Sequence, residues 1–207
     1  MFAKDYRRQA WGRLSGNWGV AILAYLLYSL IIGALSGTGI GVLILAGPLY
    51  AGLIAVFVQL ARTGSAKIEY MFENLTNGFV NKMLTYILME VYTFLWALLF
   101  IIPGIVKGYS YSMAFYIMND NPEMGANEAI TRSREMMNGH KWQLFCLHFS
   151  FIGWILLSVL TFGVLMIFVA PYMQAAEAEF YENLKAEAGL AQAAPTTKET
   201  TDSTEFI

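Results

Sequence analysis

The sequence predicts an all-α membrane protein in which six transmembrane helices form three hairpins. Of the 207 residues, 57% are hydrophobic and 14% are charged, whereas in soluble domains about a quarter of the residues are charged. Twelve of the thirteen Lys and Arg residues lie in four segments, and long apolar stretches separate these segments. The short turns inside those stretches carry no charge. Each stretch with its turn is therefore read as one membrane hairpin.

The first hairpin is expected over residues 18–61, with apolar stretches from Trp18 to Leu35 and from Gly41 to Ala61. The second is expected over residues 83–118 and the third over residues 142–178. The stretches are close to the roughly 20 residues that a helix needs to cross a bilayer. The later half of the second hairpin, from Ile105 to Met118, is shorter and more polar than the others.

A segment with apolar residues on one helical face precedes each hairpin, which predicts three amphipathic helices at the membrane surface. The residues on these faces are Phe2, Tyr6, Ala10 and Leu14, then Ile68, Met71, Phe72, Leu75 and Phe79, then Ala126, Ile130, Ser133 and Met137. With a period of about 60 residues, the pattern predicts a threefold internal repeat. Residues 1–185 would form one membrane domain, followed by a disordered tail over residues 186–207.

The distribution of basic residues predicts the orientation, because Lys and Arg gather on the cytoplasmic side of membrane proteins. Both termini and every charged loop are therefore expected in the cytoplasm. Lys107 alone falls outside the four basic segments, and we expect its side chain to reach toward the outer surface.

Proline and small residues recur in the second helix of each hairpin and predict where helices pack closely. Proline in a spanning helix leaves a carbonyl without its hydrogen bond, and small residues let a neighbouring helix approach. We therefore expect the second, fourth and sixth spans to lie inside. The predicted packing residues are Gly47, Pro48, Ala51, Ala55, Pro103, Gly104, Gly108 and Pro171.

A polar site inside the bilayer is the main functional hypothesis at the level of residues. Glu90 lies midway along the third span, where a carboxylate is costly unless it is protonated or paired. A purely structural role, as a protonated hydrogen-bond donor, is the alternative. The residues that could join Glu90 in such a site are Lys107, Tyr109, Tyr111, Ser112, His148 and Gln174. Glu177, Glu179 and Glu182 follow the sixth span and are expected to form a solvated face.

Several functional classes lack their signals. The net charge of −2 argues against a nucleic-acid partner. No phosphate-binding loop, zinc-protease motif or nucleophile elbow is present, so we expect no catalytic residues. We also expect no cofactor and no metal. The expected partners are the lipid bilayer and a protein or lipid that binds the cytoplasmic face.

Motifs along nearly the whole chain resemble those of a bacterial membrane family known as domain of unknown function 975. The motifs are Gly16-Asn17-Trp18, Tyr109 to Ala114, Ser133 to Trp142, Phe145, Ser150 to Trp154, Pro171-Tyr172 and Phe180-Tyr181. The resemblance implies a multipass protein of the bacterial cytoplasmic membrane. It implies no particular activity.

We therefore expect a protein without enzymatic activity that organises lipids or interacts with a partner in the membrane. The alternative is a small transporter or channel that uses a polar site around Glu90, since helices interrupted by proline in repeated halves are typical of transporters.

Overall fold

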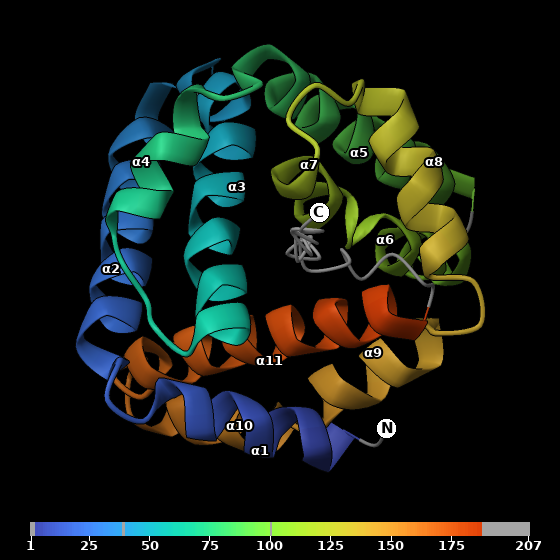
Figure 1. Cartoon of the computed structure of the whole chain (residues 1–207). Helices are drawn as coiled ribbons and strands as arrows, with labels where there is room; N and C mark the ends of the chain where they lie inside the picture. The colour runs from blue at the N-terminus through green and yellow to red at the C-terminus, as the bar shows by residue number, and fades with distance from the viewer. Residues whose placement is uncertain (1–2, 39, 100, 188–207) are drawn as a thin grey trace, which may run out of the picture.

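The computed structural model describes residues 3–38, 40–99 and 101–187, and the regular elements in these ranges are all helical. In chain order they are α1 (Ala3–Leu14), α2 (Trp18–Leu35), the short 3-10 turn η1 (Ser36–Thr38), α3 (Ile40–Thr63), α4 (Glu69–Thr76), α5 (Phe79–Leu99), α6 (Ile101–Tyr111), α7 (Ala114–Asp120), α8 (Ala126–Met136), α9 (Lys141–Phe149), α10 (Ile152–Leu160) and α11 (Met166–Glu187). They form three groups arranged in a ring (Figure 1).

Each group begins with a short helix, and a glycine turns the chain from that helix into the next one. Gly16, Gly78 and Gly139 have φ values of +91°, +65° and +85°. Side chains strongly disfavour this left-handed region, and glycine enters it without steric cost. The three junctions therefore depend on the same residue type in the same conformation.

Contacts between the groups follow one rule around the ring. The short helices α1, α4 and α8 pack against α11, α3 and α7, respectively, each from the preceding group. We call α2, α5 and α9, which follow the short helices, the first helices of the hairpins, and α3, α6 and α11 the second helices. The second helices α3, α6 and α11 pack against α5, α9 and α2, respectively, which are the first helices of the next group. Because α11 contacts both α1 and α2, the last group closes onto the first.

In the first hairpin, α2 faces outward and α3 lies inside, whereas α6, expected inside, exposes Ile102, Ile105 and Val106. Only 11% of Trp18–Leu35 is buried, compared with 67% of the most apolar part of Gly41–Thr63. Large apolar side chains on the outer helices, such as Leu30, Phe94 and Val159, are exposed. Large exposed apolar surfaces mark contact with a membrane or with another protein, and three apolar helices are compatible with a membrane location.

Among the described residues, three segments are long and apolar enough to cross a membrane: Trp18–Leu35, Gly41–Thr63 and Lys141–Leu160. Helices α3 and α11 cross steeply, since α3 runs up the view in Figure 1 and α11 runs across it.

The expected fourth span, from Ile105 to Met118, is not continuous. It divides into α6 and α7 at Ser112 and Met113. Ser133 of α8 bridges this break, because its hydroxyl accepts a hydrogen bond from the Met113 amide at 3.2 Å and donates one to the Ser110 carbonyl at 2.9 Å. Side-chain bonds to backbone groups can replace the regular helical pattern, and the hydropathy pattern did not reveal this replacement.

The sixth helix is also displaced from its expected range. Residues 162–165 form a turn in which Phe162 is 99% exposed with φ +51°, and α11 then extends to Glu187. Residues 186 and 187 of the predicted tail are therefore helical. Residues 188–207 lie outside the described residues.

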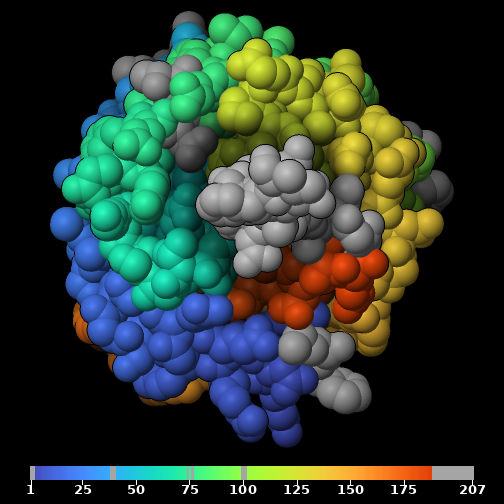
Figure 2. All heavy atoms as spheres, viewed as in Figure 1, coloured from blue at the N-terminus to red at the C-terminus, as the bar shows by residue number. Residues whose placement is uncertain are grey.

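The apolar face of α1 packs against protein, whereas Phe72 on the predicted apolar face of α4 is exposed. Tyr6, Ala10 and Leu14 of α1 are buried, and the Tyr6 ring meets Phe180 of α11 edge to face at 5.3 Å. Helices α1, α4 and α8 border the same face of the molecule (Figure 2).

Candidate functional site

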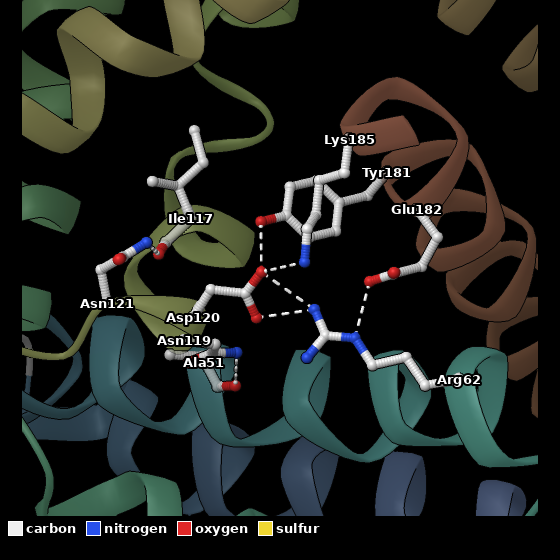
Figure 3. A network of polar contacts seen from close by, with 9 residues as sticks. All are labelled: Ala51, Arg62, Ile117, Asn119, Asp120, Asn121, Tyr181, Glu182 and Lys185. Atoms are coloured by element: carbon white, nitrogen blue, oxygen red, sulfur yellow. Dashed lines mark hydrogen bonds and ion pairs between the residues drawn. The ribbon is translucent and has the colours of Figure 1, made fainter. Parts of the chain in front are cut away.

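Charged side chains from the ends of α3, α7 and α11 meet in one network (Figure 3). Arg62 Nη2 lies 2.6 Å from Asp120 Oδ1, and Arg62 Nε lies 2.8 Å from Glu182 Oε1. Lys185 Nζ lies 2.6 Å from Asp120 Oδ2, to which the Tyr181 hydroxyl also donates at 2.9 Å. We call these five residues the closed cluster, since two cations are matched by two carboxylates.

Asp120 is the centre of the closed cluster. Burial alone would raise the pKa of its carboxyl, but hydrogen bonds from Lys185 and Arg62 outweigh burial and lower the pKa below the ordinary value. Burial and the neighbouring Asp120 carboxylate raise the pKa of Tyr181 far above its ordinary value. Tyr181 therefore stays a hydrogen-bond donor, and the cluster ties the ends of three helices together.

A second polar chain runs through the interior between α6, α7, α9 and α11. His148 Nε2 lies 2.8 Å from Glu177 Oε1, and His148 Nδ1 lies 3.3 Å from the Tyr109 hydroxyl. The Tyr116 hydroxyl donates to Glu177 Oε2 at 3.3 Å. The imidazole and the carboxylate therefore lie within hydrogen-bonding distance of each other, and each also contacts the hydroxyl of one tyrosine.

A third site contains cations without matching acids. Lys107 of α6, Arg134 of α8 and Lys141 of α9 line a cavity of about 330 Å³, together with Ser110, Thr131, Glu135 and Asn138. Lys107 Nζ lies over the Trp96 ring at 4.5 Å from its centre. Within residues 3–38, 40–99 and 101–187, the structure gives none of the three cations an ion pair. We call this cavity the basic pocket.

The position of Lys107 differs from the expectation. It was expected to reach the outer surface, away from every basic segment. The structure brings it beside Arg134 and Lys141, which belong to one of those segments. The packing of α6 accounts for this placement, because α6 contacts both α8, which carries Arg134, and α9, which begins at Lys141.

The polar residues predicted around Glu90 do not form one site. Glu90 is exposed on α5. Tyr109 and His148 are brought together in the interior chain. The other two residues of the fourth span serve local structure, because Tyr111 packs against Tyr92 and the Ser112 hydroxyl donates to the Tyr109 carbonyl. Gln174 lies beside Tyr50, and its Oε1 is buried without a hydrogen bond.

Three acidic residues of α11 were expected on a solvated face. Glu179 is instead 6% exposed, with Arg13 Nε at 3.3 Å from Oε1, and burial raises its pKa despite that cation. Glu177 and Glu182 belong to the polar networks described above. Their spacing along a helix gave no signal of this, since the partners come from α7, α9, α3 and α1.

The predicted packing glycines differ in the space around them, as the position that a Cβ would take at each shows. At Gly47 it would lie 2.5 Å from the Lys82 carbonyl oxygen, and at Gly104 it would lie 2.9 Å from Ala97 Cα. At Gly108 it would meet no atom within 4 Å, which corrects the expectation of a close approach there. Gly52, which the sequence did not single out, has the Met71 carbonyl oxygen at 2.5 Å.

The other predicted packing residues lie mainly on inner helices. Ala51 and Ala55 are buried, and the Ala51 carbonyl accepts a hydrogen bond from Asn119 at 2.7 Å. Pro48 and Pro171 lie inside α3 and α11. Pro103 lies in the first turn of α6, where proline is tolerated because the first amides have no helical partner.

Within the part of the chain that the structure describes, no group of three or more His, Cys, Asp or Glu residues could hold a metal ion. The polar groups present are suited to ion pairing and proton sharing.

Residues 98–188 match the model of the family described as protein of unknown function (DUF975). The match confirms the resemblance that the motifs predicted, and it includes α6 to α11 and the residues of the basic pocket. No curated protein and no solved structure matches the chain significantly.

Proposed function

We propose, with the DUF975 match of residues 98–188 as the premise, that this chain is a multipass protein of a bacterial cytoplasmic membrane. It would organise lipids or hold a membrane partner, without catalysis. The observation that carries the proposal is the outward apolar surface of the first helices, exemplified by the low burial of Trp18–Leu35. Such a surface needs lipid around it.

The threefold repeat belongs to this proposal. The three left-handed glycines, the cyclic packing of α1, α4 and α8, and the outward position of the first helices support it. In this arrangement the tips of the hairpins point to the outside of the cell. The face bordered by the short helices, and both termini, lie in the cytoplasm, as the basic residues favour.

Aromatic side chains between α1, α2, α10 and α11 agree with a role in contact with lipid. Trp11, Trp18 and Trp154 line an apolar groove of about 360 Å³. Tryptophan is enriched where proteins meet the boundary between lipid and water.

Cysteine labelling tests the proposed topology. In a Cys146→Ser background, Phe162→Cys at an exposed hairpin tip should react with a membrane-impermeant thiol reagent in intact cells. Ser65→Cys, which follows α3, should react only after permeabilisation. Labelling of Ser65→Cys in intact cells would overturn the orientation. If Phe162→Cys reacted with the reagent in neither intact nor permeabilised cells, this would argue against a hairpin that crosses the membrane.

The transporter alternative is tested by flux. The exposed position of Glu90 on α5 offers no enclosed polar path to support it. Vesicles containing the protein should therefore show no solute or proton flux above empty vesicles. Flux that Glu90→Gln abolishes would favour the transporter over the proposed function.

A further inference from the structure

We propose that the basic pocket binds the phosphate-bearing headgroup of an anionic phospholipid. This inference rests on the proposed function, because it needs the pocket to lie at the surface of a bilayer. It goes further by naming the ligand chemistry and the residues that recognise it.

Unmatched charge is the first observation. Lys107, Arg134 and Lys141 face one cavity with Glu135 as the only acid in its lining. Like charges that gather without counter-ions repel one another, and a bound anion relieves that repulsion. The pocket therefore favours an anionic ligand, in contrast to the closed cluster, where carboxylates already neutralise the cations.

The hydrogen-bonding groups indicate a phosphate. Ser110 and Thr131 already donate their hydroxyl protons to the carbonyls of Val106 and Asn127, at 2.9 Å in both cases. The donors left for a ligand are the two ammonium groups, the Arg134 guanidinium and the Asn138 amide. A guanidinium suits phosphate oxygens because it presents two parallel N–H groups.

The surroundings indicate a lipid as the source of the phosphate. Trp142, which follows Lys141, is 70% exposed, and Trp96 holds Lys107 by a cation–π contact. Ile105 and Val106 of α6 are also exposed. Basic and aromatic residues beside an exposed apolar surface are typical of the headgroup level of a membrane, and basic pockets beside membrane helices bind anionic headgroups.

Thermal unfolding in mild detergent provides the test. The purified, delipidated protein is titrated with phosphatidylglycerol, phosphatidylcholine or inorganic phosphate. A ligand that binds only the folded state raises the melting temperature. We expect phosphatidylglycerol to raise it by several degrees and the other two probes to have little effect.

Matched variants locate the site. The pocket variant Lys107→Gln/Arg134→Gln/Lys141→Gln should bind phosphatidylglycerol about a hundredfold more weakly, since each basic side chain near an anionic lipid contributes roughly fivefold. The control Lys4→Gln/Arg8→Gln/Lys67→Gln removes the same charge from exposed positions outside the pocket and should bind like the wild type. Asn138→Asp, which adds a carboxylate and removes no cation, should also weaken binding, and it serves if the triple variant does not fold.

Equal weakening by both triple variants would overturn the site, because attraction would then depend on overall charge. Equal stabilisation by inorganic phosphate would overturn the lipid as the source. The outcome for the proposed function is separate: protein that inserts and labels as expected, but shows no preference for phosphatidylglycerol, would refute this inference alone.

Discussion

The closed cluster and the basic pocket each gather charged side chains from three helices, yet they have opposite electrostatic states. In the closed cluster, Arg62 and Lys185 share Asp120, and Arg62 also binds Glu182. In the basic pocket, the described residues provide no ion pair for Lys107, Arg134 or Lys141. The comparison indicates that one site stabilises the fold, whereas the other is left for a ligand.

The largest expected effect comes from removing the central acid of the closed cluster. Asp120→Asn leaves Arg62 and Lys185 partly buried without their shared carboxylate, and loss of one partner of such a pair costs about 3 kcal/mol. We expect a corresponding loss of unfolding free energy in detergent. Glu182→Gln, which removes a single contact, should cost clearly less. Equal losses would contradict the central role of Asp120.

The basic pocket depends on packing, because α6 approaches α5 closely at Gly104 and the described residues offer Lys107 no ion pair. Gly104→Ala places a Cβ 2.9 Å from Ala97 Cα, and overpacking costs about 1–3 kcal/mol. Its matched control is Gly108→Ala, where the Cβ meets no atom within 4 Å and alanine favours the helix. The melting temperature of Gly104→Ala should be lower than that of the wild type, and that of Gly108→Ala should be equal to it or higher. The reverse order would refute the close approach at Gly104.

The closed cluster should make the stability of the fold depend on pH. The pKa of Asp120 is lowered from its ordinary value of 3.8, so its contribution is complete above that value and is lost as the pH falls through the lowered pKa. Glu179 has the opposite sign: its pKa is raised from 4.5, so its contribution is complete below that value and is lost as the pH rises through the raised pKa. Melts between pH 2.5 and pH 7 should show a shallower loss on the acid side for Asp120→Asn. If Asp120→Asn lost stability with falling pH as steeply as the wild type, Asp120 would be excluded as the source of the pH dependence.

The smallest effect is expected in the basic pocket without a ligand. Arg134→Gln removes a charge that has no ion pair among the described residues, so the unfolding free energy should change by less than about 0.5 kcal/mol. Stability in delipidated detergent solution measures this directly. A loss as large as that of Asp120→Asn would mean that the two sites do not differ in the way proposed.

Local patterns in the sequence predicted much of the fold. The apolar stretch from Trp18 to Leu35 is α2 in the structure, and its length and hydropathy were enough to predict this helix. The close approach of the Lys82 backbone to Gly47 was also predicted, because a small residue beside Pro48 is a signal that can be seen in the local sequence. Placement of the first helices outside and of α3 and α11 inside also followed from the small residues and prolines.

The parts that the sequence did not predict depend on distant partners. The break after Tyr111 depends on Ser133, which lies in α8, the short helix of the next group. Glu177 was expected in solvent, and its burial depends on His148 and Tyr116. The basic pocket was missed because Lys107 seemed isolated in the sequence, whereas the contact of α6 with α8 brings it to Arg134. Hydropathy describes segments and contains no information on how they cross.

The hydroxyl of Ser133 has a consequence for mechanics. Because it satisfies both the Met113 amide and the Ser110 carbonyl, the interruption between α6 and α7 is a fixed bend and not a hinge. Helices α6, α7 and α8 should therefore move as one body, and the Met113 amide should exchange its hydrogen slowly although it lies at a helix break. A force applied to Arg134 would pass directly to the neighbouring Ser133 and thence to the bend.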